Sequence, residues 1–289
     1  MFGRMGGLLA AVLALLALPC ATAAASDPGT PTSTPGVSCP VQPVASLGCP
    51  SPDTGGSTPA NSGATSPTTA SSTKAPPPDE VLSNELSFTE FAYVKRISNV
   101  YAQPSTKSRR ISRLQWYTED GFSSIYLLLR AHWNKRTEWI KIRIPGRPNG
   151  RTGWVQRNAL ARFHLTHDAV VVNRERMRMT YYRNGHAIWN APVGVGARSM
   201  PTPKGHFWIN ERFVITNPSD GYYPYAFGTT DYSTLTDWPG GGVVGIHGPY
   251  GAPASAIPGR ISHGCIRLRI RDDFWLGKHL QMGTPVRVV

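Results

Sequence analysis

The chain has 289 residues, including 26 Pro and 29 Gly, and a formal net charge of +13. This length allows roughly two domains of about 100–200 residues each. No segment after the N-terminal region approaches the roughly 20 consecutive apolar residues that a bilayer span requires, which excludes a multi-span membrane protein.

The first 25 residues have the features of a signal peptide. Arg4 provides a positive start, residues 8–18 form an apolar run of 11 residues, and small residues at 21–25 offer cleavage sites. An uncleaved membrane anchor is the alternative, and a lipoprotein is disfavoured because Pro19 precedes Cys20. We therefore predict an exported protein, located in the cell wall, the periplasm or the medium, with no stable membrane span after signal cleavage.

Residues 26–85 are predicted to be a disordered linker rich in Pro, Ser and Thr. They contain almost no large apolar side chains, so burial would not offset the entropy of ordering them. Cys39 and Cys49 lie in this segment and are free to pair in an oxidising compartment. Cys265 is then an odd thiol, which is either a buried structural residue or a reactive one.

The charge is distributed unevenly along the chain. One Lys and five acids give residues 26–85 a charge of −4, and Arg4 adds +1, so residues 86–289 carry +16. A basic folded part attracts polyanions. For an exported chain we predict an anionic cell wall rather than nucleic acid as the partner. A solvated basic surface without a specific partner is the alternative.

Residues 86–163 are predicted to form a small β domain. Ile140, Ile142 and Ile144 alternate with basic residues, as in a half-buried strand. The order of residues 100–104, Trp139 and then Gly-Trp-Val at 153–155 resembles a bacterial SH3-type domain, which implies a small barrel with a wall-binding or spacer role. The expected strands are 91–94, 98–101, 125–130, 139–144 and a strand beginning at 153.

Residues 164–289 are predicted to form a mainly β sandwich with one short helix at 272–280, where Asp272 or Asp273 would begin the helix. Asn184-Gly185 is a strong hairpin signal. The expected strands are 169–173, 178–182, 187–195, 207–210, 243–247 and 285–289.

The candidate chemistry lies in residues 247–267. A thiol needs a base or a positive neighbour to become a nucleophile, and His247, His263 and Arg267 surround Cys265 in the sequence. If the segment is extended, Ile266, Leu268 and Ile270 share one face and the thiol and guanidinium share the other.

Glycines flank both reactive side chains. Gly264 allows close approach of a substrate, and its N–H with that of Cys265 is a candidate oxyanion donor. The alternatives are an inert His247 at a strand end, or a zinc site made of two His and one Cys.

His247-Gly248, followed by Ser262-His263-Gly264-Cys265-Ile266-Arg267, resembles the signature of the L,D-transpeptidase (YkuD) catalytic domain. Three further segments resemble the family in the right order: Ala-Pro-Val-Gly-Val-Gly at 191–196, Thr-Pro-Lys-Gly-His-Phe at 202–207 and Gly-Thr-Pro-Val at 283–286. The resemblance covers about residues 165–289.

The resemblance implies roles for individual residues. Cys265 is the nucleophile, His247 is the general base and acid, and the carbonyl of Gly248 orients the imidazole. His263, Arg267 and Ser262 belong to the substrate cleft.

It also implies an activity, an acyl transfer in peptidoglycan biosynthesis that bears on the cell wall and cell shape. Cys265 forms a thioester with the L-centre third residue of a tetrapeptide stem, D-Ala leaves, and an amine takes the acyl group to give a 3→3 crosslink. Water as the acceptor would make the enzyme a carboxypeptidase. No cofactor or metal is implied, and carbapenem-type inhibitors are expected to acylate the thiol.

Three rival interpretations fit less well. A sortase would need a larger separation than the 18 positions from His247 to Cys265, and a Thr-Leu-x-Thr-Cys type of segment. Peptidases of the NlpC/P60 type place the Cys before the His. A non-catalytic wall-binding protein with a decayed site is disfavoured because all the reactive positions are present.

Overall fold

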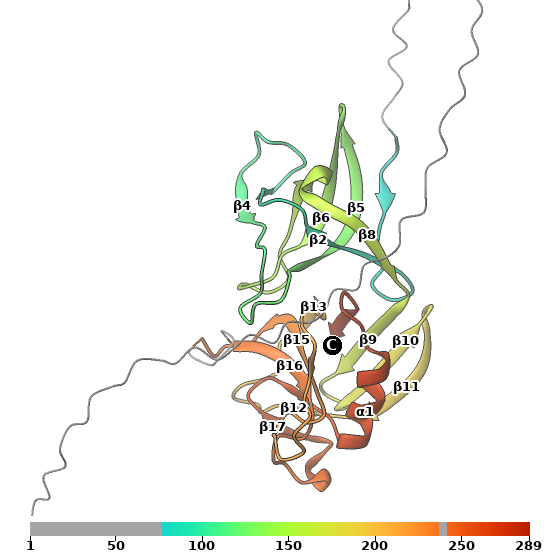
Figure 1. Ribbon diagram of the computed structural model, residues 1–289, viewed down its shortest axis with the longest axis vertical. Helices are drawn as coiled ribbons and strands as arrows, with labels where there is room; N and C mark the ends of the chain where they lie inside the picture. Colours follow the sequence, from blue (N-terminus) through green and yellow to red (C-terminus); the bar gives the residue numbers. More distant parts are fainter. Residues whose placement is uncertain (1–76, 237–241) are drawn as a thin grey trace, which may run out of the picture. The chain divides into compact units, whose positions relative to one another are not determined.

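The computed structural model describes residues 77–236 and 242–289 (Figure 1). The predicted signal peptide, most of the predicted linker and the cysteines at 20, 39 and 49 lie outside the described residues. All described residues belong to one unit, residues 69–289. Within them, no helix is long and apolar enough to cross a membrane.

The first part of the described chain is a single antiparallel sheet of eight strands. Its order is β4-β3-β7-β6-β5-β2-β8, with β1 paired to β5. Ile140, Ile142 and Ile144 are all buried in its core, as their alternation predicts. The strands are β1 (Glu80–Val81), β2 (Thr89–Val94), β3 (Asn99–Tyr101), β4 (Arg110–Arg113), β5 (Ile125–Asn134), β6 (Thr137–Arg143), β7 (Thr152–Gln156) and β8 (Leu160–Thr166), with a 3-10 turn at Arg157–Ala159 before β8.

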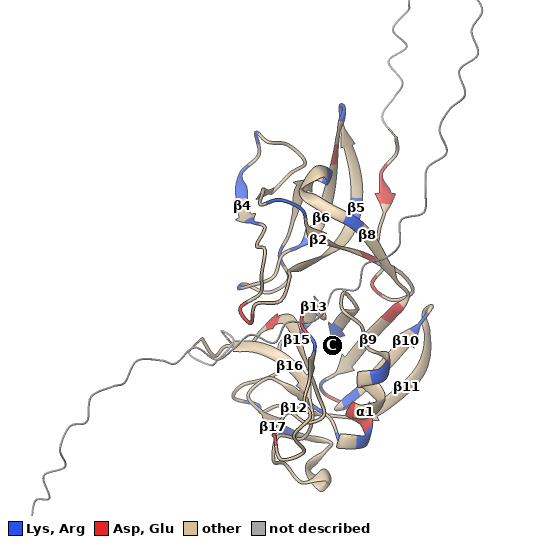
Figure 2. Ribbon diagram, viewed as in Figure 1, with Lys and Arg blue, Asp and Glu red and all other residues tan. Residues whose placement is uncertain are grey.

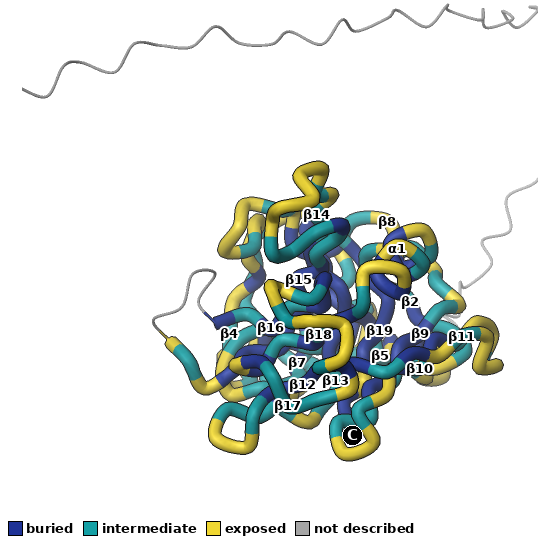
Figure 3. Tube along the Cα trace, turned by 90° about the horizontal axis from the view of Figure 1, so that it is seen from below, coloured by how far each residue is buried: buried dark blue, intermediate teal, exposed yellow. Residues whose placement is uncertain are grey.

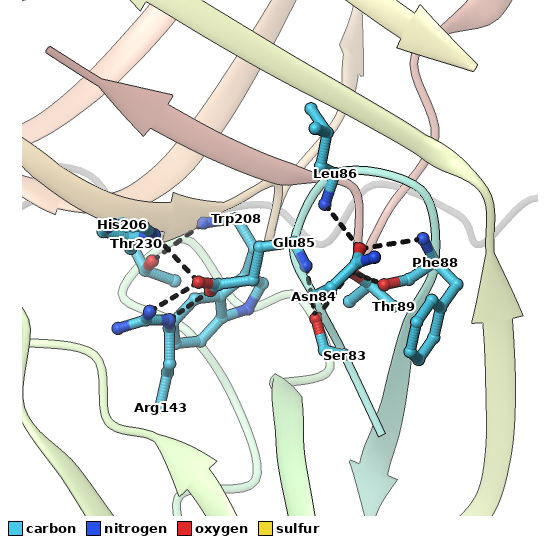
Figure 4. Close-up of polar contacts among 10 residues, drawn as sticks. All are labelled: Ser83, Asn84, Glu85, Leu86, Phe88, Thr89, Arg143, His206, Trp208 and Thr230. Atoms are coloured by element: carbon cyan, nitrogen blue, oxygen red, sulfur yellow. Dashed lines mark hydrogen bonds and ion pairs between the residues drawn. The ribbon is translucent and has the colours of Figure 1, made fainter. Parts of the chain in front are cut away.

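Ordered structure begins before residue 86, where the sequence places the end of the linker. Leu82 is buried in the core of the first sheet, and Glu85 is held by two partners. Figure 4 shows the Glu85 carboxylate accepting hydrogen bonds from Arg143 of β6 and from His206 of the following domain. Burial opposes ionisation of Glu85, but these two partners outweigh it and hold its pKa at about 2. The segment therefore connects the two parts of the chain.

The remaining residues form two sheets that share one core, a mainly β sandwich as predicted (Figures 1 and 3). One sheet has the order β11-β10-β9-β19-β13 and the other β14-β15-β16-β18-β12-β17. Leu276 and Leu280, on and just after the single helix α1 (Ile270–His279), also lie in this core. The strands are β9 (Asp168–Asn173), β10 (Arg178–Arg183), β11 (His186–Pro192), β12 (Gly194–Gly196), β13 (Gly205–Trp208), β14 (Phe213–Val214), β15 (Tyr225–Tyr232), β16 (Val243–His247), β17 (Gly259–Ser262), β18 (Ile266–Arg267) and β19 (Pro285–Val288), with a 3-10 turn at Ala254–Ala256.

The Asn184-Gly185 hairpin is present between β10 and β11. Arg183 pairs with His186, and both turn residues have positive φ, 52° and 78°. A two-residue loop with both φ values positive is the type I′ turn that this dipeptide favours.

Two sequence expectations differ from the structure. The strand expected at 187–195 is split, because Pro192 has no N–H for the ladder, and the chain crosses there from one sheet to the other. The helix begins at Ile270 rather than at 272, so Ile270 is 44% exposed and does not share the buried face of Ile266 and Leu268.

The first sheet packs against the sandwich through named contacts. The indole N–H of Trp208 donates to the carbonyl of Ile125, and the N–H of Ile125 donates to Asn210 Oδ1. Phe91, Ile125, Leu127 and Trp208 form an apolar cluster at this junction. The loops of the first sheet that contact β15 are thereby fixed next to the candidate site.

Candidate functional site

Two neighbouring strand ends place the candidate reactive side chains together. β16 and β18 run parallel, and His247, the last residue of β16, pairs in register with Arg267 of β18. Cys265 directly precedes β18, so it lies beside Gly245, whose N–H donates to the sulfur at 3.4 Å. His247 and Cys265 line the same cavities. His247 and Cys265, which are 18 positions apart in the sequence, therefore lie close together across one strand pair.

The His247 imidazole is buried and oriented by the main chain. Its Nδ1 lies 2.8 Å from the carbonyl oxygen of Gly248. A carbonyl only accepts hydrogen bonds, so Nδ1 carries the proton in the neutral ring and the lone pair is on Nε2. Burial lowers the pKa of His247 to about 4, and the nearby Arg267 charge adds to this while the Gly248 carbonyl opposes it. At neutral pH the ring is therefore an uncharged base.

Cys265 is a partly buried thiol that is protonated at neutral pH. Burial raises its pKa, and the Gly245 N–H and the Arg267 guanidinium lower it only in part. The sequence correctly predicts that Arg267 lowers the pKa of Cys265, but the opposite effect of burial on that pKa is larger. The resting pair is therefore a neutral thiol beside a neutral imidazole, rather than a thiolate beside a cation.

The turn before the nucleophile is held by two buried hydroxyls. Ser262 Oγ donates to the carbonyl of Cys265 at 2.5 Å and accepts from the N–H of Gly264 at 3.2 Å. Thr202 Oγ1 donates to the carbonyl of Gly264 at 2.7 Å and accepts from the N–H of Gly196 at 2.9 Å. Gly264 has φ 130°, a conformation that favours glycine. The separate motifs at 191–196, 202–205 and 262–267 therefore meet at one turn.

The predicted oxyanion donors have different positions in this turn. The N–H of Gly264 already donates to Ser262, so it is engaged in the resting site. The N–H of Cys265 is the second candidate that the sequence suggests. The structure thus makes Ser262 a residue that positions the turn.

Arg267 and His263 border one side of the thiol. The Arg267 guanidinium lies 5.1 Å from the centre of the Tyr250 ring, and its Nε is buried with no hydrogen-bond partner among the described residues. Arg267 also lines the first cavity beside Cys265, where a guanidinium can hold an anionic group. His263 is exposed at the rim of the same cavity.

Two tyrosines of the site are not predicted from the sequence. Tyr222 contacts His247 edge-on with ring centres 4.8 Å apart, and Tyr250 contacts both Tyr222 and His247. These rings pack against the imidazole, which is 2% exposed. Because they lie in loops between strands, no periodic pattern marks them.

Two cavities open on either side of Cys265 and share Tyr222, Val243, His247 and Tyr250. The first, here called the basic cavity, contains Ser262, His263 and Arg267. The second, here called the acidic groove, is lined by Asp120, Glu211, Phe213, Ile215, Ala226, Phe227, Gly228 and Gly245 in addition to the shared residues. Among residues 77–236 and 242–289 there is no group of three or more His, Cys, Asp or Glu side chains arranged to hold a metal.

This fold and site define a β-sandwich domain with a thiol–imidazole centre at two neighbouring central strands of one sheet. Residues 167–288 match the family model of the YkuD L,D-transpeptidase catalytic domain, so the chain contains such a domain. The match covers the residues that the sequence motifs indicate.

Named relatives agree with this assignment. The chain is 29% identical over 141 residues to the probable L,D-transpeptidase ErfK/SrfK of Salmonella typhimurium, covering 42% of this chain and 44% of that protein. It is 28% identical over 142 residues to the probable L,D-transpeptidase YbiS of Escherichia coli, covering 43% and 45%. The chain thus spans less than half the length of these curated relatives.

Among solved structures, a mutant of the Enterococcus faecium L,D-transpeptidase is 26% identical and covers 42% of this chain and 49% of that chain, with a TM-score of 0.32.

Proposed function

We propose that the chain is a peptidoglycan L,D-transpeptidase, an acyltransferase with Cys265 as its nucleophile. The observation that carries this proposal is the partly buried thiol beside an imidazole whose Nδ1 donates to the Gly248 carbonyl, in a domain that matches the family model. The hydrogen bond leaves Nε2 free to accept a proton.

The first half of the reaction forms a thioester. The Cys265 sulfur attacks the carbonyl of the third, L-centre residue of a tetrapeptide stem while His247 Nε2 takes the thiol proton. Because both groups are neutral at rest, the proton moves as the substrate arrives. The developing oxyanion is stabilised by the N–H of Cys265. His247 then gives the proton to the amine of the leaving D-Ala.

The leaving D-Ala carries a carboxylate, which the basic cavity suits. The Arg267 guanidinium and the exposed His263 line this cavity and are the groups that would hold it. In the second half, an amine from another stem attacks the thioester and gives a 3→3 crosslink. Water in place of the amine would give a carboxypeptidase.

The rest of the chain fits an envelope enzyme. We infer a signal peptide at 1–25, a linker that starts at 26 and ends before β1, an SH3-like domain up to residue 163 and the catalytic domain at 164–289, with export to the wall, periplasm or medium. Figure 2 shows Lys and Arg on both the first sheet and the sandwich, which suits an anionic wall.

The test is mass spectrometry of products from defined tetrapeptide muropeptides. Cys265→Ala should form no acyl-enzyme with stem or carbapenem and no crosslink. His247→Ala should lose nearly all turnover while its near-ultraviolet circular dichroism stays that of the wild type, and His186→Ala, an exposed histidine of the β10–β11 hairpin, is the matched control. Crosslinking retained by Cys265→Ala, or a stoichiometric metal in the wild type, would refute the assignment.

A further inference from the structure

Part of the basic cavity is lined by two segments that lie between β15 and β16. Ser233 and Leu235 follow β15 and Gly242 precedes β16, and these three residues are here called the cavity wall. The N–H of Ser233 donates to the carbonyl of Gly242 at 2.9 Å, which joins the two segments. Ser233 also lies against the turn of the nucleophile, because a Cβ on Gly264 would be 3.1 Å from the Ser233 Cβ. The position of the cavity wall therefore sets the space beside Cys265.

A side chain of the first sheet donates hydrogen bonds to the cavity wall. Arg147 belongs to the loop between β6 and β7. Its Nη2 donates to the carbonyl of Ser233 at 2.8 Å and to the carbonyl of Leu235 at 2.7 Å, and its Nε donates to the carbonyl of Ser233 at 3.2 Å. A Cβ on Gly242 would lie 1.9 Å from the Leu235 carbonyl oxygen and 2.7 Å from Arg147 Nη2. The planar fork of one guanidinium thus fixes two carbonyls of the cavity wall at once.

Two more residues of the first sheet hold the chain just before the cavity wall. The Asn149 amide donates to the carbonyl of Tyr232 at 3.0 Å and to Asp231 Oδ1 at 2.7 Å, and it accepts from the N–H of Tyr232 at 3.2 Å. Glu119, in the loop between β4 and β5, accepts from the Tyr232 hydroxyl at 2.6 Å. The Arg147 guanidinium lies 5.1 Å from the centre of the Tyr232 ring. The end of β15 is therefore held by two loops of the first sheet.

These polar contacts are separate from the apolar junction between the first sheet and the sandwich. That junction is formed by Phe91, Ile125, Leu127 and Trp208. Arg147 is exposed, so it adds little buried apolar area to the packing of the two parts. The thiol pair has its own supports, the Gly245 N–H and the Gly248 carbonyl. Loss of the Arg147 donors should therefore change the cavity wall while the fold and the thiol pair stay intact.

We propose that Arg147 of the first sheet is a positioning residue of the thiol site, which holds the cavity wall in the shape that receives the acyl donor. This inference rests on the proposed function, in which the basic cavity takes the carboxylate of the leaving D-Ala. A cavity wall that is free to shift would loosen the donor in the ground state and in the transition state alike, which raises KM and leaves kcat unchanged. The first sheet thereby shapes the active site, a role beyond that of a spacer or a module that binds the cell wall.

The test compares donor turnover with the intrinsic reactivity of the thiol on the full chain. Arg147→Met keeps an apolar stem and removes the donors. For this variant we expect the KM for a tetrapeptide stem, measured by D-Ala release, to rise roughly fivefold, with kcat within about twofold of the wild type. Alkylation of Cys265 by iodoacetamide, followed by mass spectrometry of the peptide that contains it, should keep its wild-type rate and pH profile.

Three companion variants separate the hydrogen bonds of Arg147 from its charge. Arg147→Lys keeps the charge without the planar fork, so its donor KM should lie between those of the wild type and Arg147→Met. Arg162→Met removes the same charge from an exposed position on β8 and is the matched control, for which we expect the wild-type KM. Asn149→Ala removes the hydrogen bonds that hold the main chain of Tyr232, and it should raise the donor KM as well.

Four outcomes overturn the inference. These are a wild-type donor KM in Arg147→Met, a loss confined to kcat, an equal loss of donor turnover and alkylation, and a wild-type KM in Arg147→Lys, which would assign the effect to charge rather than to the two carbonyls. If circular dichroism shows that Arg147→Met does not fold, Arg147→Lys and Asn149→Ala decide by the same two measurements. If the wild type itself releases no D-Ala, the proposed function fails instead.

Discussion

The Thr202 hydroxyl connects two parts of the site. Removing it is therefore the most direct way to perturb the turn that carries the nucleophile. Thr202→Val keeps the shape of the side chain and removes the oxygen that bridges the N–H of Gly196 and the carbonyl of Gly264. Thr202 is 1% exposed, and both glycines are buried, so water does not replace the lost partner.

The size of the effect follows from these two orphaned groups. A buried donor or acceptor left without a partner costs about 1–3 kcal/mol. Two such groups, with the added methyl filling the space, give a loss of about 3 kcal/mol. For a domain of this size that corresponds to a drop in Tm of about 6–12 °C. Because Gly264 adjoins Cys265, the rate of thiol acylation should fall as well.

The assay is thermal unfolding followed by circular dichroism, together with the rate of adduct formation with a carbapenem. Thr180→Val is the matched control, since Thr180 is half-buried on strand β10 of the other sheet and makes no contact with the turn among the described hydrogen bonds. A Tm within about 2 °C of the wild type and an unchanged acylation rate in Thr202→Val would show that the bridge does not hold the nucleophile.

Two further predictions concern the base. In Gly248→Ala the new Cβ would lie 1.9 Å from the Tyr223 carbonyl, so the main chain that orients His247 must move, and we expect acylation by a carbapenem to fall more than tenfold with a stability loss of about 1–3 kcal/mol. A wild-type rate in this variant would exclude the Gly248 carbonyl as the orienting group. His247 acts as a base only when neutral and its pKa is lowered to about 4, so the acylation rate should persist as the pH falls to about 5 and drop below that. Loss of half the rate near pH 6.5 would contradict the burial argument.

The fold is predictable from the sequence where hydrophobic alternation is regular. The alternating isoleucines of β6 and the Asn184-Gly185 turn are of this kind. Strand β15 is not predicted, because its buried residues include Thr229, Thr230 and Asp231, and buried polar residues hide the apolar pattern. The SH3-like identity of the first sheet stays a prediction.

Only those residues of the candidate site that belong to one local sequence motif are predictable from the sequence. His247 and Cys265 fall within 18 positions, and their strands pair in register. Glu211 and Asp120 come from separate segments that meet only in the folded chain, and no spacing in the sequence connects them to the thiol. The charge difference between the two cavities is therefore a property of the tertiary structure.

The protonation state of the pair would keep the thiol usable in the exported protein that we propose. A thiolate is the form that reacts with oxidants and disulfides, and an exported chain would meet both. Burial raises the pKa of Cys265 and lowers that of His247, so neither group is charged until a substrate provides a carbonyl for the sulfur to attack. In the proposed reaction, Arg267 near the sulfur would stabilise the negative charge that develops during the attack rather than a standing thiolate. A site arranged in this way is unreactive at rest and reacts when an acyl donor is bound. An unshielded thiolate in the same compartment would be reactive at rest as well.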